Sequence, residues 1–489
     1  MSARPSPGPP HPQPRPSTAR LASADRAARV RFRRAVALML MTLLLPGSAQ
    51  LVAGDKRVGR IALRVWMALL ATGLLTAVAV LIHRELVFTL AANVALLGVL
   101  RLLLVALALG WAALFVDAWR LGQPLSLQQR QRLAAVGLNG FLSFAVAGTL
   151  LFGAHLVAVQ RDFIVTMFGT GDATGAHDGR FNVLLLGGDS GAGRWGLRPD
   201  SMTIASIDAR TGRTVLIGLP RNMENFPFAA GSVMDKQFPH GFDCTGCYLN
   251  GVSTWAGDHT DLFPHSKAPG VDATIMAIEG ITDLKINYWA MVNLEGFKGL
   301  VDAVGGVTLN VRQPIPVGGL GSDVTGYLKP GVRKLNGFQT LWFARARDGS
   351  DDYSRMARQK CVMGAMLQQI SPQTAVANFE KIAKASSEMI STDLPRSEVD
   401  NFVSLALKAK SEPIATVSLV PPMIDTANPD MKVIRRAVDQ AIEQSEHPDS
   451  DKSSHGKRKL KRQVVTGGSI GSRDNGYAAN QSQNLATSC

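Results

Sequence analysis

Residues 181–222 read FNVLLLGGDSGAGRWGLRPDSMTIASIDARTGRTVLIGLPRN, with three apolar segments separated by turn residues. The first segment, residues 182–186, predicts a buried strand, and residues 202–207 and 214–219 predict two more. The Ala-Arg-Thr-Gly sequence of residues 209–212 predicts a turn that joins the last two strands as a hairpin. The stretch therefore predicts neighbouring strands that alternate in direction.

A glycine pattern in the same stretch imitates a nucleotide-binding motif. Gly191, Gly193 and Gly196 follow the first strand with the G-x-G-x-x-G spacing of dinucleotide-binding folds. Such a fold needs a helix before the next strand, but only residues 197–201 remain for it, and they include Pro199. No Gly-Lys-Ser/Thr follows, so a P-loop is excluded as well.

Charged residues lie at the ends of these strands. Asp189 ends the first strand, Asp200 precedes the second with Arg198 just before it, and Arg221 follows the third. In an antiparallel arrangement, all four emerge at one end of the sheet. Two carboxylates and two arginines on one rim suit a divalent cation together with phosphate oxygens. Taken singly, each aspartate is also an ordinary turn residue.

A second charged stretch, residues 344–359, reads ARARDGSDDYSRMARQ. Its arginines repel one another unless an anion lies among them, and a guanidinium group suits carboxylate and phosphate oxygens. The alternative is a solvated charge run in which aspartates neutralise the arginines. The arginines are Arg345, Arg347, Arg355 and Arg358, and the aspartates are Asp348, Asp351 and Asp352.

Two helices are expected around this stretch. Asn336 predicts the N-cap of a helix through Phe343, with Arg345 and Arg347 just past its end. Asp352 predicts the cap of the next helix, and the N-terminus of a helix attracts phosphate. Three side chains of that helix share one face because of their i, i+3 and i+4 spacing; they are Arg355, Arg358 and Gln359.

The composition points to a membrane. Only 18% of the 489 residues are charged, and the mean hydropathy of +0.09 is unusual for a soluble protein. Residues 35–158 are rich in Leu, Ala and Val and predict three to five transmembrane helices. Residues 61–82 and 133–158 are each long enough to cross a bilayer, which needs about 20 apolar residues. The net charge of +14 suggests anionic partners: a membrane surface, nucleic acid or a phosphorylated ligand.

Two other apolar runs are ambiguous. Residues 86–116, with Arg101 in the middle, predict either one tilted span or a tight hairpin. Residues 35–53 are interrupted by Pro46 and Gly47, so they predict a segment that dips into the bilayer and returns. With that segment re-entrant, three helices cross the membrane.

Basic clusters set the expected orientation. They lie in residues 29–34, 56–60 and 120–132, and Lys/Arg-rich flanks stay in the cytoplasm. Both three and five crossings then send the chain outward after residue 158. The protein is therefore expected in the cell membrane as a multi-pass protein with an extracytoplasmic C-terminal domain. Nucleic acid is not expected as a partner.

Four parts of the chain follow from these observations. Residues 1–34 predict a disordered, basic cytoplasmic N-terminus, and residues 35–158 the membrane helices. Residues 172–444 predict an extracytoplasmic α/β domain, in which residues 386–444 contribute two amphipathic helices. Residues 445–489 predict a disordered polar tail.

The four cysteines do not form a disulfide framework. Cys244 and Cys247 are close enough to bridge, which an extracytoplasmic location permits. A zinc site is the alternative, although the spacing fits no common finger. Its further ligands would be His240, His259 and His265.

Five motifs occur in this order along the chain: NVLLLGGDSG, RPDSMTIASID, LPRN, VNLEGFKGLVDAVGGVTL and LNGFQTLWFARARDGSDDYSRMARQ. Together they resemble the LytR–CpsA–Psr family of bacterial cell-envelope ligases, most strongly over residues 181–369. The last motif is specific because it combines R-x-R with D-x-x-R-x-x-R-Q. The resemblance implies an α/β/α catalytic domain with a deep apolar cavity for a polyprenyl chain. The multi-span helical membrane region before it is larger than the single span common in the family.

The resemblance also implies the site residues. Asp189 and Asp200 match the metal-binding carboxylates, which would hold Mg²⁺ or Mn²⁺. Arg345, Arg347 and Asp352 match catalytic positions, and Asp352 either orients an arginine or acts as a base. The pyrophosphate-binding set is Arg198, Arg221, Arg345, Arg347, Arg355, Arg358 and Gln359.

The implied activity is that of a phosphotransferase in cell wall assembly, which attaches a polyprenyl-diphosphate-linked glycopolymer to peptidoglycan through a phosphodiester bond. A pyrophosphatase side activity is expected without an acceptor. The implied partners are the lipid-linked glycan, peptidoglycan and membrane lipid, and the polymer could be teichoic acid, arabinogalactan or capsular polysaccharide. Alternatives are a membrane-anchored polyprenyl-diphosphate-binding protein and an envelope-linked transcriptional regulator. Asn222 favours binding alone, because many members carry Asp there.

Overall fold

The computed structural model describes residues 18–82, 90–91, 93–168, 173–188, 198–319, 323–347, 350–369, 390–447, 480 and 484–485. The chain divides into two compact units. The first is Met1–Val87 with Ala95–Ala158, and the second is Phe88–Val94 with Val159–Cys489.

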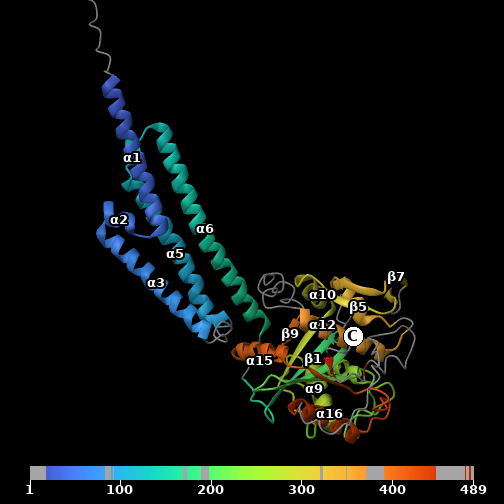
Figure 1. Cartoon of the computed structure of the whole chain (residues 1–489). Coiled ribbons are helices and arrows are strands. Elements are labelled where there is room, and N and C mark those ends of the chain that lie inside the picture. Colours follow the sequence, from blue (N-terminus) through green and yellow to red (C-terminus); the bar gives the residue numbers. More distant parts are fainter. Residues whose placement is uncertain are drawn as a thin grey trace, which may run out of the picture. The chain divides into compact units, whose positions relative to one another are not determined.

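The first unit is helical (Figure 1). Its first helix, α1 (Thr18–Leu44), differs from the expected disorder of residues 1–34, because the helix already begins at Thr18. Residues 86–116 are expected to form either one tilted span or a tight hairpin, and the part from residue 94 onward lies in one helix, α5 (Val94–Leu121). The other helices are α2 (Ser48–Ala53), α3 (Lys56–Ile82) and α6 (Gln129–Met167), the last of which continues into the second unit.

The expected interruption near residue 46 lies between α1 and α2. Gly47 has a φ of +91°, a left-handed conformation that glycine adopts without strain. A Cβ atom there would lie 2.6 Å from the carbonyl oxygen of Gly59, so α2 and α3 approach closely only because residue 47 is glycine. Trp111 Nε1 donates to the carbonyl of Thr42 at 3.0 Å and joins α5 to α1.

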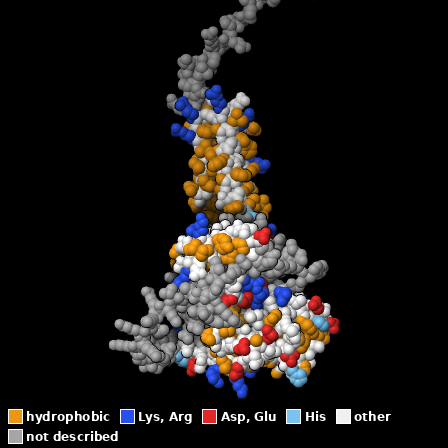
Figure 2. All heavy atoms as spheres, turned by 90° about the vertical axis from the view of Figure 1, so that its right-hand side faces the viewer, with side chains coloured by type: hydrophobic (Ala, Val, Ile, Leu, Met, Phe, Trp, Pro, Cys, Tyr) orange, Lys and Arg blue, Asp and Glu red, His pale blue; other side chains and the backbone are white. Residues whose placement is uncertain are grey.

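Three helical segments are long and apolar enough to cross a membrane: Lys56–Ile82, Val94–Ser126 and Gln129–Val165. Many of their large hydrophobic side chains are exposed, among them Leu74, Leu102 and Phe144. Figure 2 shows these helices covered mainly by hydrophobic side chains, with Lys and Arg gathered at one end. This is the surface that a membrane anchor needs.

The second unit is built on a six-stranded mixed sheet with the order β10-β3-β2-β1-β4-β9. The antiparallel pairing of β1, β2 and β3 confirms the three strands and the hairpin predicted from residues 181–222. β4 runs parallel to β1, β10 parallel to β3, and β9 antiparallel to β4. The strands are β1 (Arg180–Gly188), β2 (Pro199–Asp208), β3 (Thr214–Leu219), β4 (Tyr288–Asn293), β9 (Ile390–Thr392) and β10 (Ala415–Ser418).

Helices cover both faces of this sheet, which confirms the α/β/α arrangement. One face packs against α9 (Pro269–Thr282) and α16 (Met431–Glu446), whose Ala277 and Ile434 are fully buried in the main core. On the other face lies α12 (Asp352–Gln369) (Figure 1). Successive side chains of a strand point to opposite faces of the sheet, so the apolar residues of β1 and β2 contribute to both layers.

A smaller core holds α12 from its outer side. It is formed by buried residues of α10, α11, β5 and β8 together with Cys361 and Val362 of α12. The arginine-bearing helix is therefore fixed between the main sheet and this second core. The remaining elements are α7 (Val233–Gln237), α8 (Val252–Asp258), α10 (Leu294–Ala303), β5 (Val307–Val311), β6 (Ile315–Gly318), β7 (Val324–Leu328), β8 (Gly331–Leu335), α11 (Gly337–Arg345) and α15 (Val399–Ser411).

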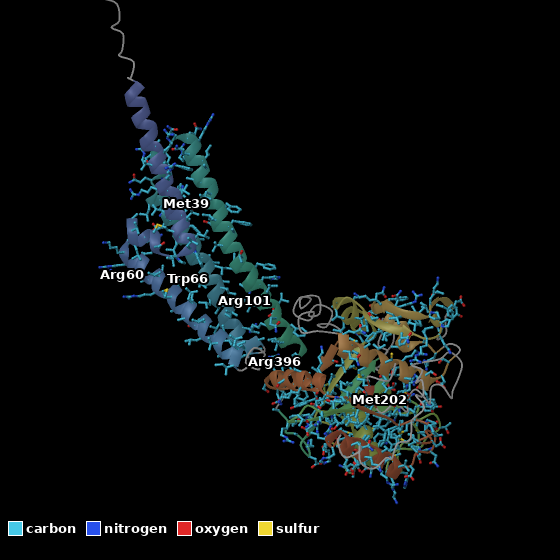
Figure 3. The ribbon with its side chains drawn as sticks, viewed as in Figure 1. Met39, Arg60, Trp66, Arg101, Met202 and Arg396 are labelled. Atoms are coloured by element: carbon cyan, nitrogen blue, oxygen red, sulfur yellow. A yellow bond between two sulfur atoms is a disulfide. The ribbon has the colours of Figure 1, made fainter. Side chains whose placement is uncertain are left out.

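Arg396 precedes α15 and closes the C-terminal end of α6 (Figure 3). Its Nη2 donates to the carbonyl of Val165 at 2.6 Å, and its Nε donates to that of Phe168 at 3.1 Å. These carbonyls lie in the last turn of α6 and just past it, where intrahelical donors run out and a cation is favoured.

Cys244 and Cys247 form a disulfide, with their Cα atoms 5.2 Å apart. Both thiols are therefore unavailable as zinc ligands. His259, one of the candidate ligands, instead stacks on Trp255 with ring centroids 4.0 Å apart.

Two features differ from the expectations for the C-terminal part. Residues 386–444 include the helices α15 and α16, but β9 and β10 were not predicted. The described residues of the tail, which was expected to be wholly disordered, are packed on the domain. Asn480 is 3% exposed and Leu485 4%.

Candidate functional site: a carboxylate–arginine cluster

Strand pairing brings the first two charged residues together. Met202 of β2 pairs with Leu219 of β3, so Asp200, two residues earlier, lies opposite Arg221, two residues later. Arg221 Nη1 donates to Asp200 Oδ1 at 2.5 Å. The antiparallel geometry predicted from the sequence therefore does place these two residues at one end of the sheet.

The N-terminus of α12 supplies the next carboxylate. Asp351, not Asp352, caps this helix, because Asp351 Oδ1 accepts the backbone N–H of Ser354 at 2.7 Å. The prediction that Asp352 is the cap was wrong. The side chain of Asp352 is turned toward the arginines instead.

Asp352 is the centre of the cluster. Its Oδ1 accepts from Arg221 Nε at 3.2 Å and lies 3.7 Å from Arg347 Nη1. Its Oδ2 accepts from Arg355 Nη2 at 3.0 Å. One carboxylate thus orients three guanidinium groups that come from the loop after β3, from the loop before α12 and from α12 itself.

Two arginines of the cluster are almost fully buried. Arg355 is 2% exposed, and its Nη1 donates to the backbone carbonyl of Asp200 at 2.6 Å. Arg358 is 1% exposed and donates Nη2 to the carbonyl of Ala346. The Nε atoms of both residues are buried and have no hydrogen-bond partner among the described residues. Buried donors of this kind are costly unless a ligand or water satisfies them.

The charges shift the ionisation of the site. Burial by itself would raise the pKa of Asp200, but the guanidinium groups of Arg355, Arg221 and Arg347 outweigh burial and hold the pKa below its usual value. Burial, together with repulsion from Arg355, lowers the pKa of Arg358 to about 10. Arg347 also has a lowered pKa, because of burial and because of the neighbouring Arg221 and Arg355. Positive charge is in excess here, and an anion would relieve it.

The remaining predicted residues lie on neighbouring elements or outside the described residues. Arg345 ends α11 and lies over the ring of Trp342, 5.9 Å from the ring centre, whereas Arg198 is exposed at the start of β2. Gln359 is partly buried on α12. Asp189 lies outside the described residues, as do Gly191, Gly193 and Gly196 of the glycine pattern.

The capping of α11 was predicted correctly. Asn336 accepts the backbone N–H of Gln339 at 2.9 Å, and the side chain of Gln339 accepts the N–H of Asn336 in return. α11 ends at Arg345, so Arg347 lies two residues beyond the helix. Asn222, next to Arg221, has a buried Oδ1 without a hydrogen-bond partner among the described residues.

The carboxylates of the cluster could hold a magnesium ion only if the phosphate oxygens of a ligand supplied further metal ligands. Among the described residues, no group of three or more His, Cys, Asp or Glu side chains is arranged to hold a metal. Mg²⁺ is often held by one or two carboxylates together with substrate phosphates and water. Asp200, at the rim of an arginine cluster suited to phosphate, fits that pattern.

The described residues also line a cavity of about 400 Å³ between β10 and α16. Its wall is partly apolar and partly polar. The apolar side chains include Val417, Val420 and Met423, and the polar ones include Thr416, Gln440 and Asn480. The deep apolar cavity for a polyprenyl chain remains a prediction, since this wall is only partly apolar.

The second unit is thus an α/β/α domain with a buried arginine cluster ordered by two carboxylates at one end of its sheet, and guanidinium groups suit phosphate oxygens. The LytR_cpsA_psr family model matches residues 165–441, which is more than half of the chain. The protein therefore belongs to the LytR_cpsA_psr family, as its motifs predicted.

Similar proteins support this assignment. Over 270 residues the chain is 27% identical to Biofilm regulatory protein A of Streptococcus mutans, a match that covers 54% of this chain and 62% of that protein. It is 28% identical over 226 residues to TagU of Oceanobacillus iheyensis, named a polyisoprenyl-teichoic acid–peptidoglycan teichoic acid transferase, with 46% and 62% covered. The chain thus spans about three fifths of the length of these relatives.

The sequence identity to solved structures is lower than the identity to these relatives. The crystal structure of Bacillus subtilis TagV matches with 21% identity and a TM-score of 0.39, covering 55% of this chain and 98% of that one. TagT bound to LIIa-WTA matches with 17% identity and a TM-score of 0.37, covering 56% and 93%. The family assignment rests on the family model and not on these two structures.

Proposed function

We propose that the protein is a phosphotransferase that attaches a polyprenyl-diphosphate-linked glycopolymer to peptidoglycan through a phosphodiester bond. The observation that carries the proposal is the cluster in which Asp352 orients Arg221, Arg347 and Arg355. Family membership and the transferase name of TagU agree with it.

The chemistry is a displacement at phosphorus. A peptidoglycan hydroxyl attacks the sugar-bound phosphorus and gives up its proton to water or to the leaving phosphate. The bond from phosphorus to the bridging oxygen breaks, and polyprenyl phosphate leaves with that oxygen. Negative charge grows on the phosphoryl and leaving oxygens. Fixed guanidinium groups stabilise this charge without reorganisation, and they lower the barrier to the extent that they bind the transition state better than the substrate. When no acceptor hydroxyl is bound, water can take its place, which gives pyrophosphatase activity as a side reaction.

The roles of the residues follow from their contacts. Arg347 is less buried than Arg355 and is therefore the better placed to meet an incoming diphosphate. Asp352 already accepts hydrogen bonds from two arginines, so it serves to orient them and not as the base. Asp200, with Asp189 from the preceding segment, would hold Mg²⁺ or Mn²⁺, which when bound neutralises charge on the phosphate oxygens.

The location is part of the proposal. The three long apolar helices anchor the protein in the cell membrane as a multi-pass protein, and the α/β domain lies outside the cytoplasm. The domain would then meet the lipid-linked glycan and peptidoglycan on the outer face of the membrane. Teichoic acid is the polymer favoured by the name of TagU; arabinogalactan and capsular polysaccharide present the same diphosphate.

A reconstitution experiment tests this function. The full chain in detergent micelles is incubated with a polyprenyl-diphosphate sugar, peptidoglycan fragments and Mg²⁺, and mass spectrometry follows polyprenyl phosphate and the joined product. Ligation should disappear with EDTA, return with added Mg²⁺, and fall at least about 100-fold in Arg347→Ala, the scale for removing one charge-stabilising donor. Arg333→Ala is the matched control, because Arg333 is an exposed arginine of β8.

Tight binding of the lipid with no product, under conditions in which a known ligase joins the same substrates, would contradict the transferase. The protein would then be a polyprenyl-diphosphate-binding protein, the alternative that Asn222 favours.

A further inference from the structure

An exposed arginine interrupts the apolar surface of α5. Arg101 is exposed, and its neighbours Val99 and Leu102 on the same helix are 62% and 71% exposed. The helix belongs to a segment that is long and apolar enough to cross a membrane, Val94–Ser126. Within the part of the chain that the structure describes, Arg101 has no hydrogen-bond or ion-pair partner. A charged group inside a bilayer is costly unless it is paired, so an unpaired one indicates a binding site.

The packing of α3 against α5 sets the level of Arg101, which lies away from Arg60 and the basic start of α3 (Figure 3). The ring centroids of Trp66 and Trp111 are 5.1 Å apart, and these residues lie near the start of α3 and near the end of α5. The two helices are therefore antiparallel, and the basic start of α3 is level with the end of α5. From Arg120 at that end back to Arg101 the helix rises about 28 Å, close to the thickness of a hydrocarbon core. Arg101 thus lies in the half of the bilayer that is farther from the basic end.

Arg64 of α3 is the contrasting case. It is exposed as well, but it lies between Trp66 and the basic start of its helix. The Cα–Cβ bonds of a helix tilt toward its N-terminus, so long side chains extend in that direction. The side chain of Arg64 therefore extends toward Lys56 at the basic end, and that of Arg101 extends toward Val94 at the other end. The two guanidinium groups reach toward opposite surfaces of the membrane.

The acidic side chains of the spans are paired elsewhere. The sequence of the three spans contains two of them, Asp117 and Asp162. Asp117 Oδ2 accepts from Gln50 Nε2 at 3.0 Å, and its position on α5 is about 24 Å along the helix from Arg101. Asp162 Oδ1 lies 3.6 Å from Arg161 Nη1. The anion that best suits Arg101 is therefore a lipid phosphate, whose oxygens a guanidinium group binds bidentately.

We propose that Arg101 binds the phosphate of a membrane lipid at the end of α5 that begins at Val94. The guanidinium group extends to the boundary of the hydrocarbon layer and pairs with the phosphate there, which removes the cost of an isolated charge. A phospholipid and a polyprenyl diphosphate both present this group. In the orientation of the proposed function this end of α5 lies in the outer leaflet, so the inference rests on that proposal for the choice of leaflet alone. The site would then hold a lipid-linked substrate beside the protein before transfer.

Photo-cross-linking in vesicles tests the site without any measurement of ligation. The full chain is reconstituted with one of three lipids that carry a diazirine near the polar head: phosphatidylglycerol, a polyprenyl diphosphate, or diacylglycerol, which has no phosphate. Mass spectrometry of the digested protein measures the labelling of α5. Arg101→Leu, an apolar replacement that suits a membrane span, should lower labelling by the two phosphate lipids at least about 5-fold, the scale for one arginine at an anionic lipid surface. Arg101→Lys should keep most of the labelling, because lysine also extends its charge to the headgroups.

The labelling of α3, which keeps Arg64 in every variant, is the internal control and should not change. Equal labelling of α5 in the wild type and Arg101→Leu would overturn the site, as would labelling by diacylglycerol that is as strong as labelling by the phosphate lipids. A dimer that dissociates in Arg101→Leu would overturn it too, because Arg101 would then contact a second copy of the chain. An effect with both phosphate lipids, or with one of them, supports the site and identifies the source of the phosphate. Arg101-dependent labelling without ligation in the reconstituted reaction would leave the lipid site in place and reject only the transferase.

Discussion

Arg355 donates its Nη1 to the backbone carbonyl of Asp200 at 2.6 Å, although the two residues are 155 positions apart in the chain. The contact joins the first turn of α12 to the start of β2. Because the same guanidinium also donates to Asp352, it fixes both carboxylates of the cluster relative to one another. The buried arginine is therefore part of the framework of the site as well as a source of charge.

Arg355→Lys tests this double role. A lysine keeps the charge but cannot reach the Asp200 carbonyl and the Asp352 carboxylate with the same planar geometry. We expect binding of a polyprenyl diphosphate to weaken at least about 10-fold, since one charge-assisted hydrogen bond contributes about 1.5–3 kcal/mol. Isothermal titration calorimetry measures the change. The exposed Arg333→Lys is the control, and equal affinity in both variants would show that charge alone suffices.

The lowered pKa of Asp200 predicts the acid sensitivity of the fold. In the unfolded chain an aspartate has a pKa of about 3.9, so between that value and its lower folded pKa the unfolded chain binds this proton more readily. The stabilisation from Asp200 is therefore present above about pH 4 and is lost as the pH falls through the folded pKa. The difference in Tm between the wild type and Asp200→Asn should be constant above about pH 5 and should shrink below pH 4. A difference that grows on acidification would contradict this assignment.

The strands at the centre of the site could be predicted because their signals are local. The segments of residues 181–222 and the turn at residues 209–212 fix both the strands and the antiparallel register that sets Asp200 against Arg221. β10 could not be found in this way, because its four residues pair with β3 from about 200 positions away. A short apolar run of that kind has no local pattern that identifies its neighbour.

The capping error has a physical cause as well. Asp351 and Asp352 are consecutive, and either carboxylate suits an N-cap by its chemistry. Arg221 and Arg355 draw Asp352 into the cluster, which leaves the cap to Asp351. Long-range ion pairs with the arginines thus determine which aspartate is the N-cap, and local sequence propensity cannot distinguish the two.

Arg358 is expected to destabilise the fold. It is fully buried, its pKa is lowered to about 10, and its Nε has no partner among the described residues. Replacing a buried charge by an apolar side chain of similar volume is often neutral or stabilising by about 1–4 kcal/mol. We expect Arg358→Met to keep or raise the Tm while diphosphate binding weakens at least about 10-fold. A strong loss of both would mean that Arg358 is mainly structural.

The role of Asp352 can be separated from that of a general base by the pH dependence of the reaction. Asp352→Asn keeps an oxygen that can accept from Arg221 or Arg355 but removes the charge that orients them, so kcat/KM should fall about 10–100-fold. If Asp352 only orients arginines, the pH profile of the remaining activity keeps the shape of the wild-type profile. If it is the base, the acidic limb that reports its ionisation disappears, because the group that must be deprotonated is gone. Rate measurements between pH 5 and pH 8 on both proteins decide this, with Arg333→Ala to correct for pH effects on the substrate. We expect the acidic limb to persist, since both oxygens of Asp352 already accept hydrogen bonds from arginines.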